Sequence, residues 1–386
     1  MSWRKCDSVS ERREFVGLAN VEGANFSELC KRFGVSRKTG YKWLARWREE
    51  GQAGLQDRSR RPLASPEKTD ATIEEMVLAI RSEHPAWGGR KIRKRLEVLG
   101  VVSPPAASTI TAILHRHQMI SKEESNKHRA FGSFQRAQPN ELWQVDFKGE
   151  FKLTDRKLCY PLTVLDDHSR YSLAIIACEN QRRRTVQDHF RGVFRRYGLP
   201  RAIYVDNGNP WSNGHHEMRH TRFSAWLMRH DVGVIYGRPY HPQGRGKLER
   251  FHRTLKLEAL QGLQFDTLSA VQCRFDPWRE MYNHERPHES LGLSTPSEYY
   301  QISERCFREQ TKPYQYSDRF KVRKTNRYGQ LSFHGDVYRV SEAFIDQPIG
   351  LTATTTDGVW DLWYCRFRIA QLDERSKTIR RHQPCG

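Results

Sequence analysis

Apolar residues recur at helical spacing on both sides of a turn signal near the start of the chain. Phe26, Leu29 and Phe33 follow the helical interval. Gly34 suits a left-handed turn and Ser36 suits an N-cap, so a second helix should begin directly after them. The pattern predicts a helix-turn-helix within residues 1–51. The apolar side of its second helix is expected to carry Tyr41, Leu44 and Trp47.

A second group of amphipathic segments follows, and it predicts another all-α module over residues 64–121. Apolar positions at helical intervals mark segments 73–80, 92–99 and 110–114. The two modules are separated by a stretch of linker composition that contains Arg58, Arg60 and Arg61.

The pattern then changes to short β-prone runs alternating with helical ones. Residues 142–147, 160–165, 171–177 and 202–205 have strand character, and residues 185–197 are helical with an apolar side. Further helical spacing follows in residues 223–230 and 248–259. Strands and helices in this order predict an α/β core.

Short alternating runs separated by turn residues fill the end of the chain. Apolar alternation at 331–333, 337–340, 349–353 and 359–364, with Asp357-Gly358 as a favoured hairpin pair, predicts a small β-barrel. Residues 375–381 are expected to be a charged tail. The predicted domains are therefore 1–63 with a basic linker, 64–121, a linker at 122–138, a core at 139–302, and 303–386 as barrel and tail.

The net charge of the chain indicates the kind of partner it binds. The 386 residues include 65 Lys and Arg against 45 Asp and Glu, a formal net charge of +20 with a pI of about 9.8. A surplus of this size favours a nucleic-acid partner and salt-sensitive binding. A basic surface kept only for solubility is the alternative.

Other classes of protein find little support. No apolar run approaches the roughly 18 residues of a membrane span, and no secretory segment is indicated. The eight cysteines include no C-x-x-C pair, which argues against a zinc ribbon or a redox motif. We expect a cytoplasmic, nucleoid-associated protein.

Three carboxylates carry the candidate chemistry. Asp146 and Asp206 each follow a β-prone run, whereas Glu249 lies in a helical run. If they converge, they could hold two hard divalent cations about 3.5–4 Å apart, the arrangement used for in-line phosphoryl displacement. The ordinary alternatives are turn residues for the aspartates and a surface pair with Arg253 for the glutamate.

The motifs around these carboxylates resemble those of DDE transposases of bacterial insertion sequences, whose catalytic core is of the retroviral-integrase type. They occupy residues 143–146, 204–208 and 241–250, with Tyr282-Asn283 and residues 286–288 downstream. The resemblance implies a ribonuclease H-like core with a mixed five-stranded sheet, in which the first and fourth strands lie side by side. It also implies that Asp146, Asp206 and Glu249 are the catalytic residues and ligate two Mg²⁺ or Mn²⁺ ions.

Several neighbouring side chains are candidates for supporting roles. Lys148, Asn207 and His241 could orient the carboxylates. Asp166 and Asp167 are expected to form a turn after the second strand.

The expected DNA contacts are basic or polar residues in three places: the second N-terminal helix, the first linker and the helix of Glu249. They are Arg37, Lys38, Thr39, Lys42, Arg46, Arg58, Arg60, Arg61, Lys247, Arg250, Arg253 and Lys256. A recognition helix presents its first residues to base edges and its later cations to phosphates. A helical hairpin with a solvated basic face remains the alternative.

Together these features predict a transposase that binds the terminal repeats of its element and catalyses metal-dependent DNA cleavage and strand transfer. Its partners would be double-stranded DNA and, by resemblance, further copies of the chain. A helix-turn-helix regulator with an inactive core and a nonspecific ribonuclease H-type nuclease remain as alternatives.

Overall fold

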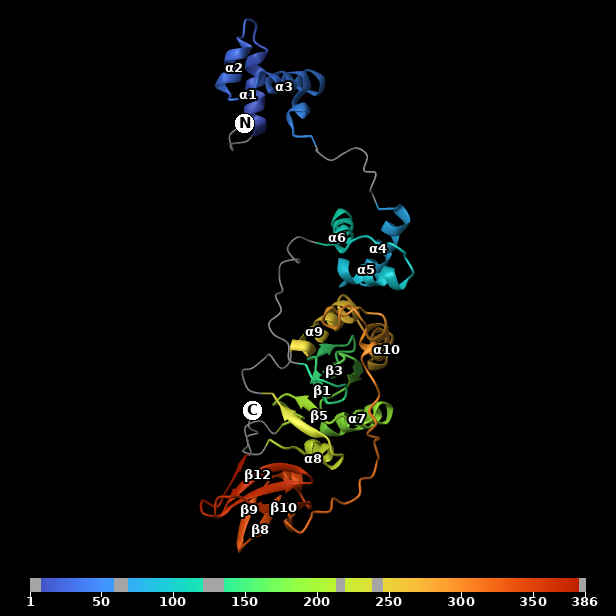
Figure 1. Cartoon of the computed structure of the whole chain (residues 1–386), viewed down its shortest axis with the longest axis vertical. Helices are drawn as coiled ribbons and strands as arrows, with labels where there is room; N and C mark the ends of the chain where they lie inside the picture. The colour runs from blue at the N-terminus through green and yellow to red at the C-terminus, as the bar shows by residue number, and fades with distance from the viewer. Residues whose placement is uncertain (1–7, 59–68, 121–134, 213–218, 238–245, 382–386) are drawn as a thin grey trace. The chain divides into compact units, whose positions relative to one another are not determined.

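The computed structural model describes residues 8–58, 69–120, 135–212, 219–237 and 246–381. The chain divides into two compact units, Met1–Lys68 and Thr69–Gly386 (Figure 1). The finer domain boundaries drawn from composition stay predictions.

The first unit contains helices α1 (Ser8–Ala19), α2 (Phe26–Arg32) and α3 (Arg37–Glu50). The predicted turn and cap are confirmed. Gly34 has a φ of 64°, and the Ser36 side chain accepts a hydrogen bond from the Thr39 amide at 3.1 Å. The helix-turn-helix expected from the sequence is therefore present.

Close packing of the three helices depends on Gly40 in α3. A Cβ at this position would lie 2.8 Å from the Phe15 ring and 2.9 Å from the Phe26 ring. The predicted apolar side of α3 is partly wrong, because Tyr41 is 51% exposed and stacks on Phe26, whereas Trp43 is the buried aromatic residue. The buried side of α3 therefore includes Trp43 in place of Tyr41, so it is rotated around the helix axis relative to the predicted side.

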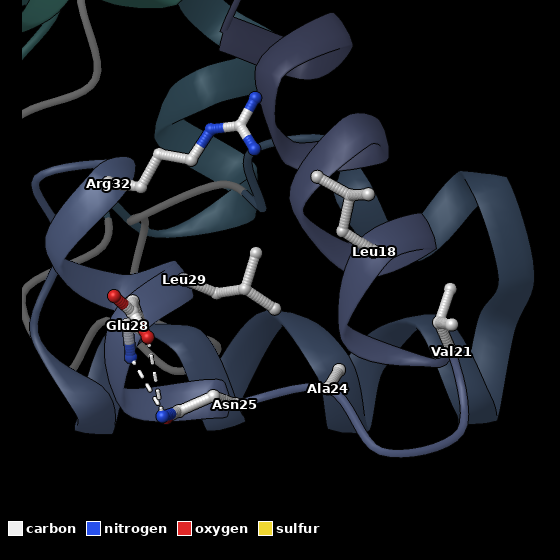
Figure 2. A pocket seen from close by; sticks show the side chains of 7 residues that line it. All are labelled: Leu18, Val21, Ala24, Asn25, Glu28, Leu29 and Arg32. Atoms are coloured by element: carbon white, nitrogen blue, oxygen red, sulfur yellow. Dashed lines mark hydrogen bonds between the residues drawn. The ribbon is translucent and has the colours of Figure 1, made fainter.

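A largely apolar depression opens on α1 and α2 of this unit (Figure 2). At its edge Asn25 caps α2 by accepting a hydrogen bond from the Glu28 amide at 3.2 Å. The depression is lined by Leu18, Val21, Ala24, Asn25, Glu28, Leu29 and Arg32.

The second helical module consists of α4 (Ala71–Glu83), α5 (Gly89–Val98) and α6 (Ala107–Arg116). The three predicted amphipathic segments are confirmed as helices around one apolar cluster. Gly89 permits close contact of α5 and α6, since a Cβ there would lie 2.3 Å from the Ala107 carbonyl oxygen.

The core sheet has the strand order β4-β3-β1-β5-β6, with the short β2 also paired to β3. β1 pairs parallel with β5 and antiparallel with β3, and β5 pairs parallel with β6. The mixed sheet and the adjacency of the first and fourth predicted strands are therefore confirmed, but the sheet has six strands and not five, because the short β2 was not predicted. The strands are β1 (Leu142–Phe147), β2 (Phe151–Lys152), β3 (Leu158–Asp166), β4 (Ser172–Cys178), β5 (Ala202–Val205) and β6 (Gly233–Tyr236).

Helices cover both faces of this sheet. α7 (Arg183–Tyr197) and α8 (Arg222–Arg229) share one apolar cluster with β1 and β5. α9 (Gly246–Leu255), the π-helical turn Lys256–Leu260 and α10 (Leu268–His284) share another with β3 and β4. Within the described residues, no helix has the length and apolar character to cross a membrane.

The C-terminal part forms a five-stranded sheet, β13-β12-β11-β10-β7, and a separate β8-β9 hairpin. A closed barrel is not confirmed by the pairing of the described strands. The predicted charged tail is also corrected, because residues 378–381 pair with β12 as strand β13. The strands are β7 (Lys321–Lys324), β8 (Gln330–Phe333), β9 (Asp336–Arg339), β10 (Pro348–Ala353), β11 (Val359–Tyr364), β12 (Phe367–Asp373) and β13 (Thr378–Arg381).

Candidate active site

Two of the three candidate carboxylates lie at the ends of neighbouring parallel strands. Gln144 of β1 pairs with Tyr204 of β5 in parallel register. The pairing ends there, and Asp146 and Asp206 each lie two positions further along the chain. Both carboxylates are half-buried, and they lie near the carboxyl ends of two neighbouring parallel strands.

The backbone after Asp206 folds back onto its carboxylate. The Gly208 amide donates to Asp206 Oδ1 at 2.9 Å, and a Cβ at Gly208 would lie 3.2 Å from both carboxylate oxygens. Asn207 Nδ2 donates to the Gly237 carbonyl oxygen at 2.9 Å, which ties this turn to the end of β6. A supporting role of Asn207 toward the carboxylates stays a prediction.

The third candidate, Glu249, lies in the first turns of α9. Leu248, Phe251 and Leu255 form the buried stripe of that helix, and Glu249 is exposed beside it. The helix begins at Gly246, and His241, the other supporting candidate, falls outside the described residues.

A short chain of hydrogen bonds connects α9 to the backbone of Asp146. His252, one helical turn after Glu249, contacts Thr163 Oγ1 through Nε2 at 2.8 Å. The Thr163 hydroxyl donates to the Asp146 carbonyl oxygen at 2.9 Å, and Thr163 is the cross-strand partner of Asp146. Burial lowers the pKa of His252 to about 4, so the ring is neutral at pH 7. The helix face next to Glu249 is thus held near the end of β1.

Lys148, the remaining supporting candidate, is half-buried directly after β1. Burial and then the charge of Lys256 lower its pKa. A cation from β1 and one from the α9 side therefore lie close enough to influence each other.

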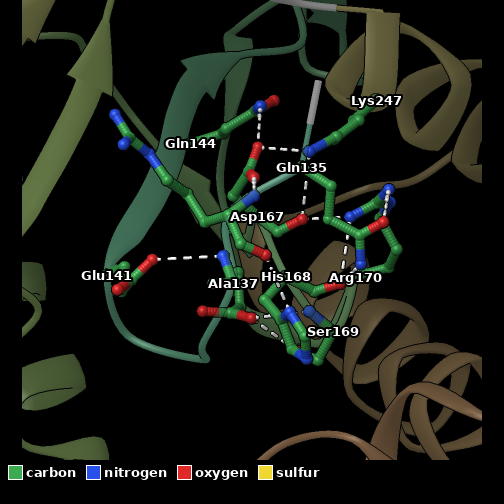
Figure 3. A network of polar contacts seen from close by, with 11 residues as sticks. Gln135, Ala137, Glu141, Gln144, Asp167, His168, Ser169, Arg170 and Lys247 are labelled. Atoms are coloured by element: carbon green, nitrogen blue, oxygen red, sulfur yellow. Dashed lines mark hydrogen bonds and ion pairs between the residues drawn. The ribbon is translucent and has the colours of Figure 1, made fainter. Parts of the chain in front are cut away.

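A second connection to α9 starts from the turn after β3 (Figure 3). Asp167 is fully buried, and its Oδ1 accepts hydrogen bonds from Lys247 Nζ at 2.6 Å and Gln144 Nε2 at 2.7 Å. Burial lowers the pKa of Lys247 to about 8 despite this partner. The assignment of Lys247 as a DNA contact is therefore corrected, because its ammonium is directed into the core.

Asp166 and Asp167 form the end of β3 and the turn, as predicted, and both have structural partners. Asp166 accepts hydrogen bonds from the Ser169 and Asn140 amides, each at 2.8 Å, and burial raises the pKa of its carboxyl. The turn thereby joins the entry to β1 with the end of β3.

The donor types suit hard divalent cations, because carboxylate oxygens are the ligands that Mg²⁺ and Mn²⁺ prefer. Among the described residues, no cluster of three or more His, Cys, Asp or Glu side chains is close enough to hold a metal ion. The structure therefore brings Asp146 and Asp206 to one strand edge and α9 beside them, without gathering a finished ligand set.

The candidate DNA contacts fall into different environments. Arg37, Lys38 and Lys42 are exposed on α3. Thr39 instead bonds the capping Ser36 through its hydroxyl at 2.9 Å, and the Arg46 guanidinium lies 5.0 Å from the Trp43 ring centre. Arg58 forms an ion pair with Glu50.

On the helix of Glu249, Arg250 and Arg253 are exposed, and Lys256 is exposed on the π-helical turn that follows. Arg60 and Arg61 lie outside the described residues.

The downstream motif has a structural position. Asn283 accepts a hydrogen bond from the Ser172 amide at 2.8 Å and donates to the Ser172 carbonyl oxygen at 3.0 Å. Arg286 forms an ion pair with Glu258, and both side chains are buried. These contacts fix α10 to β4 and to the π-helical turn.

Sequence reasoning missed Gln144, Thr163 and His252 as site residues. Gln144 offered a signal in the sequence, because it is a polar residue within an apolar run. In the structure its side chain is buried. His252 had no comparable signal, since its partner lies on a distant strand.

Family comparisons agree with this architecture. Models described as "Integrase core domain" match residues 136–242 and 230–296. A "Helix-turn-helix domain" model matches residues 11–62, and a "Homeodomain-like domain" model matches residues 39–114. A model described as "IS481 family transposase, C-terminal domain" matches residues 320–380.

Among curated proteins, one relative is an uncharacterized protein of insertion element IS476 from Xanthomonas euvesicatoria. It is 24% identical over 72% of this chain and 79% of its own length. The transposase for transposon Tn552 from Staphylococcus aureus is 25% identical over 62% of this chain, and the chain spans 53% of that relative.

Among solved structures, the simian T-cell lymphotropic virus intasome aligns with 74% of this chain and 91% of its own at 13% identity, with a TM-score of 0.38. The HTLV-2 integrase catalytic core domain with magnesium aligns with 43% of this chain and 99% of its own at 14% identity, with a TM-score of 0.32. At these scores the structural likeness carries no further conclusion. The matches show that the chain is similar to transposases of insertion elements, with helix-turn-helix domains before an integrase-type core.

Proposed function

We propose that this chain is a transposase that binds the ends of its own mobile element, cleaves the DNA there and joins the freed 3′-hydroxyls to target DNA. The observation that supports the proposal is the parallel pairing of β1 with β5, because Asp146 and Asp206 lie near the carboxyl ends of these two strands. His252 of α9 contacts Thr163, which bonds the Asp146 carbonyl oxygen, so the helix of Glu249 packs near the end of β1.

In the proposed reaction, Asp146, Asp206 and Glu249 would hold two Mg²⁺ or Mn²⁺ ions. Bound there, such ions lower the pKa of an attacking water or hydroxyl and stabilise the leaving oxygen. The chain's own part is to orient the carboxylates: Gly208 and Asn207 set the turn at Asp206, and His252 sets the helix beside Glu249.

Recognition of the element ends belongs to the helix-turn-helix unit in this proposal. Arg37, Lys38 and Lys42 are exposed along α3, where a recognition helix would meet base edges and phosphates. Arg250, Arg253 and Lys256 would contact the DNA near the reacting bond. Several copies of the chain would act together on paired ends.

A cleavage and joining assay tests the proposal. Purified chain is incubated with labelled DNA that carries the ends of its element, with Mg²⁺, with Mn²⁺ or with a chelator. We expect 3′-hydroxyl nicks at the element boundary and joined products in either metal, and none with the chelator. End-specific binding without any cleavage would favour the regulator with an inactive core. Cleavage without end preference would favour a nonspecific nuclease.

A further inference from the structure

One buried carboxylate touches both of the elements that carry candidate ligands. Asp167 Oδ1 accepts Gln144 Nε2 from β1 and Lys247 Nζ from α9. Its Oδ2 accepts the Arg136 amide at 2.8 Å, and the Lys247 ammonium also donates to the Asp167 carbonyl oxygen at 3.1 Å. Figure 3 shows these side chains converging from the strand, the turn and the helix.

The spacing of these contacts is the same on both elements. Gln144 stands two positions before Asp146 on β1, so the two side chains share a face of the strand. Lys247 stands two positions before Glu249 near the start of α9. A single carboxylate oxygen is therefore bonded two positions before a candidate ligand on each element.

Lys247 and His252 also restrict the rotation of α9. With about 100° between successive residues of an α-helix, Lys247 lies on one edge of the buried stripe and His252 on the other. Lys247 is bonded to the turn after β3, and His252 is bonded to Thr163 within β3. Glu249 lies about 60° from His252 around the helix axis, beyond that edge. Two attachments on opposite edges oppose both sliding and rolling of the helix.

We propose that the buried Asp167–Lys247 pair positions α9 against β1 and so sets the place of Glu249 relative to Asp146. This inference rests on the proposed function, since it gives Glu249 a part in the reaction. Lys247 is in this account a positioning residue that never touches DNA. Its side chain is 12% exposed and that of Asp167 is 0% exposed, so the pair is shielded from the salt that screens surface contacts.

A buried ion pair could also serve stability alone, and paired substitutions separate the two roles. Removal of one partner leaves an uncompensated buried charge and destabilises the fold, whereas removal of both charges is often tolerated. Asp167→Asn and Lys247→Met should therefore each lower the melting temperature, and the double variant should recover much of that loss. If the pair positions α9, the double variant stays defective although it is folded.

Two readouts decide the matter. The first is amide hydrogen exchange of residues 246–252 in the full-length chain, which needs neither DNA nor metal. The second is the Mn²⁺ concentration that gives half-maximal cleavage. Loss of a group that orients a metal ligand typically costs 10–100-fold in metal affinity or activity. We expect faster exchange at the start of α9 and a 10–100-fold higher Mn²⁺ requirement in Lys247→Met and in the double variant, with partial rescue by Lys247→Arg.

Arg279→Met is the matched control. Arg279 is a buried cation that donates to the Tyr197 hydroxyl at 2.9 Å and joins α10 to α7, so its loss should lower stability without changing α9 exchange. Wild-type exchange at residues 246–252 in the double variant, or its wild-type Mn²⁺ requirement, would overturn the inference. A wild-type chain that never cleaves DNA would refute the proposed function, while the exchange measurement would still decide whether the pair positions α9.

Discussion

The strand edge and helix α9 position their carboxylates by different means. Asp146 lies on β1 and Asp206 directly follows β5, and these two strands are joined by backbone pairing. Glu249 is exposed on a helix whose orientation depends on the side chains of Lys247 and His252. The aspartates should therefore move only if the sheet is lost, whereas the glutamate can be misplaced in a folded protein.

The largest expected effect comes from neutralising the carboxylates themselves. Asp146→Asn, Asp206→Asn and Glu249→Gln should each lower cleavage and joining by roughly 10³-fold or more, since several kcal/mol of charge stabilisation is lost. DNA binding should stay close to wild type, because the exposed cations of α3 are unchanged. Rates and binding isotherms measured on the same preparations check this, and retained cleavage in any variant would remove that residue from the site.

A smaller effect is expected from the contact between α9 and β3. His252→Leu removes the contact with Thr163, and Thr163→Val removes that contact together with the bond to the Asp146 carbonyl oxygen. Each variant should raise the metal requirement for cleavage roughly 10-fold. If the two side chains act through their mutual contact, the double variant should be no worse than either single one. Fully additive losses would show that they act independently.

Acid offers a way to compare α9 with a buried histidine elsewhere in the core. Burial lowers the pKa of His230, which follows α8 and precedes β6, and that of His252 on α9, each to about 4. The unfolded chain binds these protons below about pH 6.5 and the native chain does not, so the free energy of unfolding should fall as the pH drops from 6.5 to 4.

His230→Leu and His252→Leu should each flatten that decline, by up to about 1.4 kcal/mol per pH unit for one proton. Urea unfolding at several pH values is the measurement. An unchanged slope in His230→Leu would mean that its ring is protonated in the native state.

The smallest effect distinguishes two cations on the same helix. Arg250 is exposed and would meet a phosphate, so Arg250→Ala should reduce the slope of log affinity against log salt by about 1. That is roughly a threefold smaller change in affinity between 50 and 200 mM salt. Lys247→Met should leave the slope unchanged. An equal reduction of the slope in both variants would show that Lys247 contacts DNA.

Local patterns predicted much of this fold. Strand β1 and strand β5 occur where apolar runs stood, and Gly34 and Ser36 form the expected turn and cap. These features depend on residues adjacent in sequence, whose conformational preferences can be read without knowing their partners.

Features that depend on distant contacts were predicted less well. Lys247 resembled its exposed neighbours until its partner Asp167 was known, and residues 378–381 resembled a tail until β12 was there to pair with them. Tyr41 and Trp43 both fit an amphipathic helix, and only the packing of α1 and α2 selects between them. The candidate site divides in the same way: motifs named its carboxylates, but the contacts that orient α9 came from the structure.

The most direct test of the central claim is strand transfer by wild type, Glu249→Gln and Arg250→Ala, side by side, with the element's terminal repeats in Mn²⁺. The account predicts joined product from wild type and from Arg250→Ala, and none from Glu249→Gln. Product from Glu249→Gln at the wild-type level would contradict the claim that the helix carboxylate completes the site.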